Sequence, residues 1–91
     1  MIIQNGHAGA GYGGGIYNNG TLIVRNGSII GWSSGGNTAP TGDGGGIFNN
    51  SGDITIFDNA NNTDYGNIYV RYNIADNGGG IFNVGGYIDV H

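Results

Sequence analysis

The stretch GGGIYNNGTLIV, residues 13–24, decides the fold, because nearly the same phrase occurs three times in the chain. It returns as GGGIFNNSGDITI at 44–56 and as GGGIFNVGGYIDV at 78–90. The glycine triplets begin 31 and 34 residues apart. Self-similarity at a period of roughly 20–50 residues is typical of chains that stack one structural unit on the next.

Aligning the three glycine triplets produces columns of like residues. Three columns follow the glycines directly: Ile16, Ile47 and Ile81; Tyr17, Phe48 and Phe82; Asn18, Asn49 and Asn83. Apolar residues then recur at alternate positions, as expected of strands with one buried face. The predicted core is Ile16, Ile47, Ile81, Leu22, Val24, Ile54, Ile56, Ile88 and Val90.

These columns favour a β-solenoid over a hairpin sheet, because each strand of a solenoid lies on its own counterpart from the coil below. We predict one all-β domain over residues 1–91, of about three coils, with coil starts near 13, 44 and 78. Each coil is predicted to have three strands, of which the third is an apolar run such as 28–30 or 68–70. The extra residues at 33–43 and 59–67 are predicted to be loops.

The phrase Gly-Gly-Gly-Ile-aromatic-Asn, followed by Asn-Gly-Thr-Leu-Ile-Val, resembles the repeats of parallel β-helix surface proteins. Polymorphic outer-membrane proteins, autotransporter passengers and adhesin-like surface proteins use similar phrases. The resemblance covers most of the chain. It implies a right-handed parallel β-helix and an extracellular or cell-surface location, with glycans or cell surfaces as partners. Those proteins usually have many more coils.

Composition narrows the classes of function. The chain has 22 glycines, no cysteine, 9% charged residues and a net charge of −4. Nucleic acid is an unsuitable partner, because binding it requires clusters of basic residues. No apolar run approaches the roughly 18 residues that a membrane-spanning helix requires.

No residue pattern predicts catalysis, a metal site or a cofactor. His7 and His91 have no ligand spacing, and the six aspartates form no calcium-binding loop, although calcium at a corner stays open. Arg25 and Arg71 have no acidic neighbour of the kind that polysaccharide cleavage requires. We therefore expect a protein that is not an enzyme.

Two surface features allow more than one interpretation. The column Tyr17, Phe48 and Phe82 fits either an exposed glycan-binding stripe or a stacked ladder within the sheet. Acceptor motifs for N-glycosylation occur at Asn19, Asn26, Asn49 and Asn61. Asn49 also belongs to the asparagine column, and an internal asparagine ladder would exclude a glycan there.

Both ends of the chain are predicted to be incomplete coils, at 1–12 and 78–91, without capping segments. The opening Met1-Ile2-Ile3 resembles Ser28-Ile29-Ile30, the third strand of a coil. Uncapped strand edges are templates for further pairing. The predicted assembly interface joins Ile88 and Val90 of one copy to Ile2 and Ile3 of the next, and comprises Met1, Ile2, Ile3, Tyr87, Ile88, Asp89, Val90 and His91.

The sequence thus predicts a structural protein whose subunits stack head to tail, each with the next, into an extracellular filament. The alternative is a segment of a larger adhesin or autotransporter passenger. A polysaccharide-active enzyme is the third interpretation.

Overall fold

The chain is built from short strands, and the computed structural model describes residues 2–25, 27–31, 33–57 and 68–90. These ranges contain strands, turns and bends but no helix, so the all-β prediction is confirmed. The strands are β1 (Ile2–Ile3), β2 (Ile16–Asn18), β3 (Thr21–Arg25), β4 (Ile29–Ile30), β5 (Thr38–Asp43), β6 (Ile47–Asn50), β7 (Asp53–Phe57), β8 (Tyr69–Val70), β9 (Ile74–Asn77), β10 (Ile81–Val84) and β11 (Tyr87–Val90).

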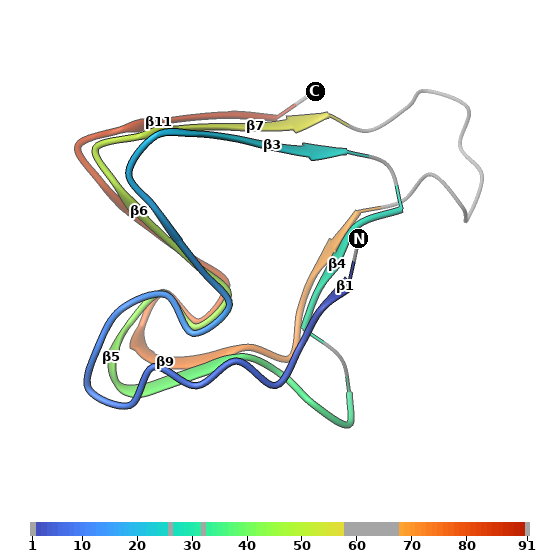
Figure 1. Ribbon diagram of the computed structural model, residues 1–91, viewed down its shortest axis with the longest axis vertical. Coiled ribbons are helices and arrows are strands. Elements are labelled where there is room, and N and C mark those ends of the chain that lie inside the picture. Colours follow the sequence, from blue (N-terminus) through green and yellow to red (C-terminus); the bar gives the residue numbers. More distant parts are fainter. Residues whose placement is uncertain (1, 26, 32, 58–67, 91) are drawn as a thin grey trace.

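Every strand pair is parallel. Three sheets have three strands each, in the orders β1-β4-β8, β10-β6-β2 and β11-β7-β3, and β5 pairs with β9. Strands of one sheet, such as β3, β7 and β11, lie one behind another in Figure 1, whereas consecutive strands of the chain belong to different sheets. This arrangement is consistent with a β-solenoid-like fold. Residues 2–25, 27–57 and 68–90 are called here the first, second and third repeats, because each supplies one strand to every three-stranded sheet.

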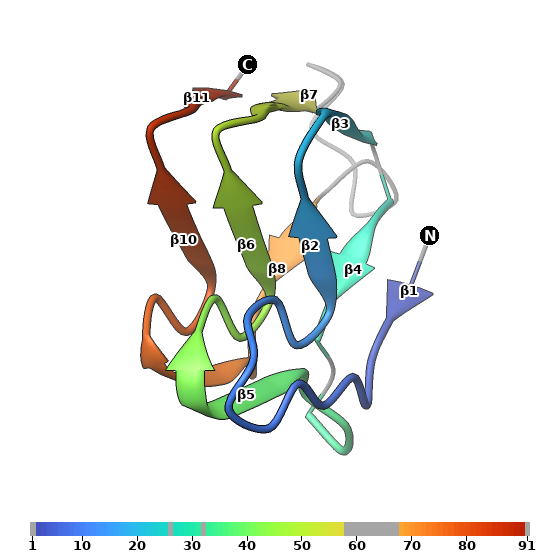
Figure 2. The same ribbon diagram turned by 60° about the vertical axis from the view of Figure 1, so that its left-hand side comes forward.

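The register of the sheets confirms the columns expected from the sequence. In the sheet β10-β6-β2, which Figure 2 shows side by side, Ile47 pairs with both Ile16 and Ile81. Ile54 likewise pairs with Leu22 and Ile88 in the sheet β11-β7-β3. A parallel strand displaced by one residue would turn its apolar face to solvent, so burial of these columns selects this register.

The opening segment also pairs as the sequence indicates. Ile2 and Ile3 pair with Ile29 and Ile30, so β1 is the counterpart of the strand that follows Ser28. In the next repeat Ile30 pairs with Val70.

The glycine triplets continue the sheet β10-β6-β2 upstream of its strands. The N–H groups of Gly14 and Gly45 donate to the carbonyls of Gly44 and Gly78 at 3.0 and 3.1 Å. The first glycines of the triplets, Gly13, Gly44 and Gly78, have φ +71°, +70° and +60°, a left-handed conformation that residues with a Cβ rarely adopt. The triplet therefore makes a corner and then brings three backbones together.

The core lies between the three-stranded sheets. Its fully buried members are Val24, Ile30, Ile47 and Ile54, and partly buried residues pack against them: Ile16, Leu22, Ile56, Ile68, Val70, Ile81 and Ile88. The prediction was wrong for Val90, which is 71% exposed. Val90 ends β11, an edge strand whose only neighbour among the described residues is β7, so nothing described covers its other side.

The predicted loop at 33–43 was wrong in part. Its second half is β5, which pairs with β9 in a fourth sheet, so the expected three strands per coil are too few. Ala39 is fully buried, and the register shifts between Ala39 and Asp43. Pro40 lies in that irregular part, where its missing N–H disturbs the pairing least. The loop expected at 59–67 lies outside the described residues.

Candidate assembly interface

The fold leaves unpaired strand edges at its two opposite faces. In the described part of the chain, the sheet orders place β1, β2 and β3 at one edge and β8, β10 and β11 at the other. Figure 2 shows this for β2 and β10, which flank β6. Edge strands present backbone N–H and C=O groups that a further strand can pair with.

The residues predicted for the assembly interface lie on these two edges. Ile2 and Ile3 form β1 in the first repeat, whereas Tyr87, Ile88, Asp89 and Val90 form β11 in the third, so the fold does not bring the two groups together within one chain. Ile2 is 58% exposed and Tyr87 77% exposed. Met1 and His91 lie outside the described residues.

Sequence reasoning missed that β2, β3, β8 and β10 are edge strands as well. The signal was present in the alignment, because the first and third members of every column have to lie at the two ends of a three-membered stack. Ile16 and Ile81 are such a pair, one on each side of Ile47.

An asparagine ladder (Asn18, Asn49 and Asn83) runs through the sheet β10-β6-β2, and all its hydrogen bonds point the same way along the stack. The side-chain amide of Asn18 donates to Asn49 Oδ1 at 2.8 Å, and that of Asn49 donates to Asn83 Oδ1 at 2.7 Å. Each amide also donates to a nearby carbonyl, that of Gly52 for Asn49 and that of Gly86 for Asn83. The ladder thus satisfies the polar groups of Asn49, which is fully buried.

A second pair of asparagines, Asn37 and Asn73, was missed by the sequence reasoning. The amide of Asn37 donates to Asn73 Oδ1 at 3.1 Å and to the carbonyl of Ile3 at 3.0 Å. Asn73 donates to the carbonyl of Ile30 at 2.8 Å in the same way. Each asparagine thus ties the end of an apolar strand to the start of the next segment. The shared triplet Asn-x-Ala, at 37–39 and 73–75, is the signal that would have found them.

The aromatic column forms a stacked ladder, here the aromatic ladder (Tyr17, Phe48 and Phe82). Ring centroids are 5.3 Å apart for Tyr17 and Phe48 and 5.5 Å apart for Phe48 and Phe82, with interplanar angles of 18° and 6°. Tyr12 also stacks on Phe48, at 4.7 Å. Because rings stacked in this way turn their faces to one another, the middle of the ladder presents no ring face on which a sugar can pack.

The glycan acceptor motifs fall in unlike environments. Asn19 is exposed, and its side-chain oxygen accepts from the amide of Asn50 at 2.8 Å. Asn49 is fully buried in the asparagine ladder, so its amide is held away from solvent. Asn26 and Asn61 lie outside the described residues.

Charged and metal-binding groups are dispersed over the described residues. No three acidic or histidine side chains of residues 2–25, 27–31, 33–57 and 68–90 come together to hold a metal ion. His7 Nδ1 lies 2.7 Å from Thr38 Oγ1, and the Arg71 guanidinium lies 4.3 Å from the centroid of the Tyr69 ring. Within the same ranges no helix is long and apolar enough to cross a membrane.

Comparison of the chain with models of protein families found no matching family. No curated protein and no solved structure matches it either. Functional inference therefore depends on the chain's own residues and geometry.

Proposed function

We propose that this is a structural, non-enzymatic protein, a right-handed parallel β-helix of three coils whose subunits stack head to tail into an extracellular filament. The observation that carries the proposal is the asparagine ladder, whose two ends are complementary. At one end, Asn18 Oδ1 accepts only a long 3.4 Å bond from Gly20 N–H among the described contacts. At the other end, Asn83 uses one of its two amide hydrogens, on Gly86. Asn83 of one copy can therefore donate to Asn18 of the next.

Stacking a second copy on the first in this way also matches the other columns of residues. Extending the observed register by one subunit sets Ile81 on Ile16 and Ile88 on Leu22, pairs of the kind that already meet within the chain. It sets Val70 on Ile3, so β8 rather than β11 meets the opening strand. The contact expected from the sequence, of Ile88 and Val90 with Ile2 and Ile3 of the next copy, would be a corner contact of the kind that β3 and β4 make within the chain, and it stays a prediction.

The aromatic ladder supports stacking as well. Phe48 has ring neighbours in both adjacent repeats, whereas Phe82 stacks only on Phe48 among the described residues. Phe82 at one end and Tyr17 at the other thus each have a ring face without a stacked ring from the described part of the chain. A head-to-tail contact lets these two faces stack and removes apolar surface from water.

The two faces of the subunit differ, so contact between them is heterologous and repeats without closing. Adjacent strands lie about 4.7–4.9 Å apart, and three repeats per subunit should therefore advance the filament by roughly 14–15 Å. The shortest dimension of the chain, 16 Å, is compatible with that advance. The extracellular location is inferred from the resemblance to surface-protein repeats alone.

The alternative is that the chain is a segment of a larger surface adhesin or passenger domain. The same exposed edge residues favour it, because further coils of one polypeptide would cover Ile2 and Val90 as well as a second copy does. The intact mass of the natural polypeptide, measured with its state of association, separates the two proposals.

The proposal is tested by sedimentation and electron microscopy of the 91-residue chain over a range of concentrations. We expect filaments with a subunit advance of about 14–15 Å. Ile2→Lys should stop elongation, because it puts a charge on the exposed edge strand β1. Pro40→Lys, which puts the same charge on an exposed residue of the middle repeat, is the control that should still elongate. A chain that stays monomeric at high concentration, or subunits that meet side by side, would refute the filament.

A further inference from the structure

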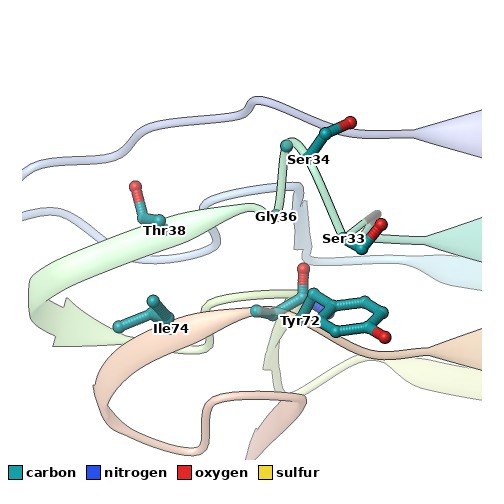
Figure 3. A pocket seen from close by; sticks show the side chains of 8 residues that line it. Ser33, Ser34, Gly36, Thr38, Tyr72 and Ile74 are labelled. Atoms are coloured by element: carbon teal, nitrogen blue, oxygen red, sulfur yellow. The ribbon is translucent and has the colours of Figure 1, made fainter.

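A pocket of about 470 Å³ lies on the flank of the molecule, between the second and third repeats. Its walls are the segment 33–36 with Thr38 on one side and the segment 72–74 on the other. Figure 3 shows Ser33 and Ser34 on the loop beside Tyr72, with Thr38 and Ile74 on the neighbouring strands. Thr38 and Ile74 are direct partners in the pairing of β5 with β9.

Close backbone approach builds this pocket. A Cβ on Gly36 would collide with the carbonyl oxygen of Tyr72, and a Cβ on Gly35 would collide with the side chain of Asn5. Gly36 therefore allows the serine-bearing loop to lie directly against Tyr72, and Gly35 allows it to lie against Asn5 of the first repeat. The second repeat supplies the hydroxyl groups and the third supplies the apolar surface.

Tyr72 has an unusual backbone conformation for its residue type. Its φ is +57°, in the left-handed region that residues other than glycine, asparagine and aspartate seldom adopt. The side chain is 56% exposed, and that of Ile74 is 61% exposed, so neither is held there by burial in the core. Asn5, at the equivalent corner of the first repeat, has φ +60°, so the fold requires this conformation in both repeats. A tyrosine in place of asparagine at this corner displays an aromatic ring at the mouth of the pocket.

The chemistry of the lining defines the ligand. Ser33 and Ser34 supply hydroxyls, which both donate and accept hydrogen bonds, whereas the Thr38 hydroxyl is already paired with His7 Nδ1 at 2.7 Å. Tyr72 and Ile74 supply an aromatic ring and an aliphatic surface. Apolar walls with a few converging polar groups are the usual composition of a small-molecule site, and the volume lies in the usual range of roughly 300–1,000 Å³.

We propose that this pocket binds a neutral pyranose oligosaccharide. A pyranose has an apolar C–H face, which packs on the negative face of an aromatic ring, and a rim of hydroxyls, which the side chains of Ser33 and Ser34 can meet. No carboxylate or ammonium lies in the lining, and the net charge of −4 disfavours an acidic saccharide. The Arg71 guanidinium lies 5.5 Å from the centroid of the Tyr72 ring and outside the lining.

The test is saturation-transfer difference NMR and titration calorimetry on the 91-residue chain, with cellotetraose, maltotetraose and tetra-N-acetylchitotetraose as neutral probes and tetragalacturonate as the acidic one. We expect at least one neutral probe to bind more tightly than tetragalacturonate. Tyr72→Asn removes the ring but suits the left-handed backbone, so it should fold and bind about tenfold more weakly. Tyr72→Phe keeps the ring and should bind within about twofold of the native chain.

Two further variants make the result decisive. Tyr12→Asn removes a half-exposed tyrosine outside the lining and should leave binding unchanged. If Tyr72→Asn does not fold, the double variant Ser33→Ala and Ser34→Ala, on exposed loop positions, should weaken binding instead. The proposal is overturned if no neutral probe binds, if tetragalacturonate binds more tightly than all of them, or if the Tyr72 and serine variants bind as the native chain does. All binding is measured with Ile2→Lys as the background, since this change should stop elongation and lies outside the lining, so the outcome does not depend on filament formation.

Discussion

The side-chain amide of Asn18 donates to the side-chain oxygen of Asn49 at 2.8 Å, although the two residues are 31 positions apart. Asn49 passes the interaction on to Asn83 at 2.7 Å. One residue type thus links three repeats through a file of amides, which is buried at Asn18 and Asn49 and exposed at Asn83. A parallel stack makes this possible because identical residues lie one strand spacing apart, which suits a hydrogen bond between adjacent amides.

Replacing Asn49 by alanine should destabilise the fold by about 3 kcal/mol, because the Asn18 amide and the Gly52 carbonyl each lose a partner in a buried position and Asn83 Oδ1 loses one in a partly buried position. Asn50→Ala is the matched control. Asn50 is half-buried and makes a single exposed side-chain bond to Asn19, so the loss there should stay below about 1 kcal/mol. Urea unfolding followed by circular dichroism measures both. Equal losses for the two variants would contradict a stabilising role for the ladder.

The isoleucine columns should be most sensitive in the middle repeat. Ile47 is fully buried, and Ile47→Ala should cost about 2–5 kcal/mol through lost contacts and the cavity that remains. Ile47→Asp should abolish folding, since the buried carboxylate has no partner. Ile74→Ala, at a side chain that is 61% exposed, should cost less than about 1 kcal/mol. Thermal unfolding measures the stability of the three variants. A small loss of stability for Ile47→Ala would show that this column is not the core.

Glycine is required at Gly45 by close packing rather than by backbone angle. A Cβ there would lie 2.5 Å from the carbonyl oxygen of Ile74 and 2.7 Å from that of Gly79. Gly45→Ala should therefore push two repeats apart and cost about 2 kcal/mol or more. A Cβ at Gly20 meets nothing within 4 Å, so Gly20→Ala should change stability by less than about 1 kcal/mol. Calorimetric unfolding of both variants measures their losses of stability. Equal losses for Gly45→Ala and Gly20→Ala would show that close packing at Gly45 is not required.

The free end of the asparagine ladder provides a specific test of stacking. Asn83→Asp keeps the oxygen that accepts from Asn49 and loses only an exposed bond to the Gly86 carbonyl, so the subunit should remain folded. Across a junction, however, the carboxylate would face Asn18 Oδ1 without a hydrogen between them. We expect the critical concentration for filaments to rise about tenfold or more.

Thr41→Asp is the control for charge alone in that experiment. Thr41 is exposed and belongs to β5 in the middle repeat, away from both outer edges. Its critical concentration should stay close to that of the native chain, as measured by sedimentation of the polymer. If both variants raise the critical concentration equally, general charge repulsion explains the effect and the ladder does not cross the junction.

Prediction succeeded where like residues stack on like. The column Ile16, Ile47 and Ile81 and the pairing of Ile2 with Ile29 were readable from the sequence, because a parallel stack repeats each environment and therefore each residue type. The fourth sheet was not readable. Between β5 and β9 only Ala39 and Ala75 are identical partners, and Pro40 argued against a strand.

The sequence by itself determined the repeat, the apolar columns and the all-strand character, because these depend on periodicity that local side-chain patterns record. Only the tertiary structure decided between the two interpretations of Phe48: its ring lies between those of Tyr17 and Phe82 and is 6% exposed. It also decided the exposure of Val90 and the pocket beside Tyr72. Each of these depends on which segments pack together across repeats, because the burial of a residue is set by its tertiary contacts and not by its residue type alone.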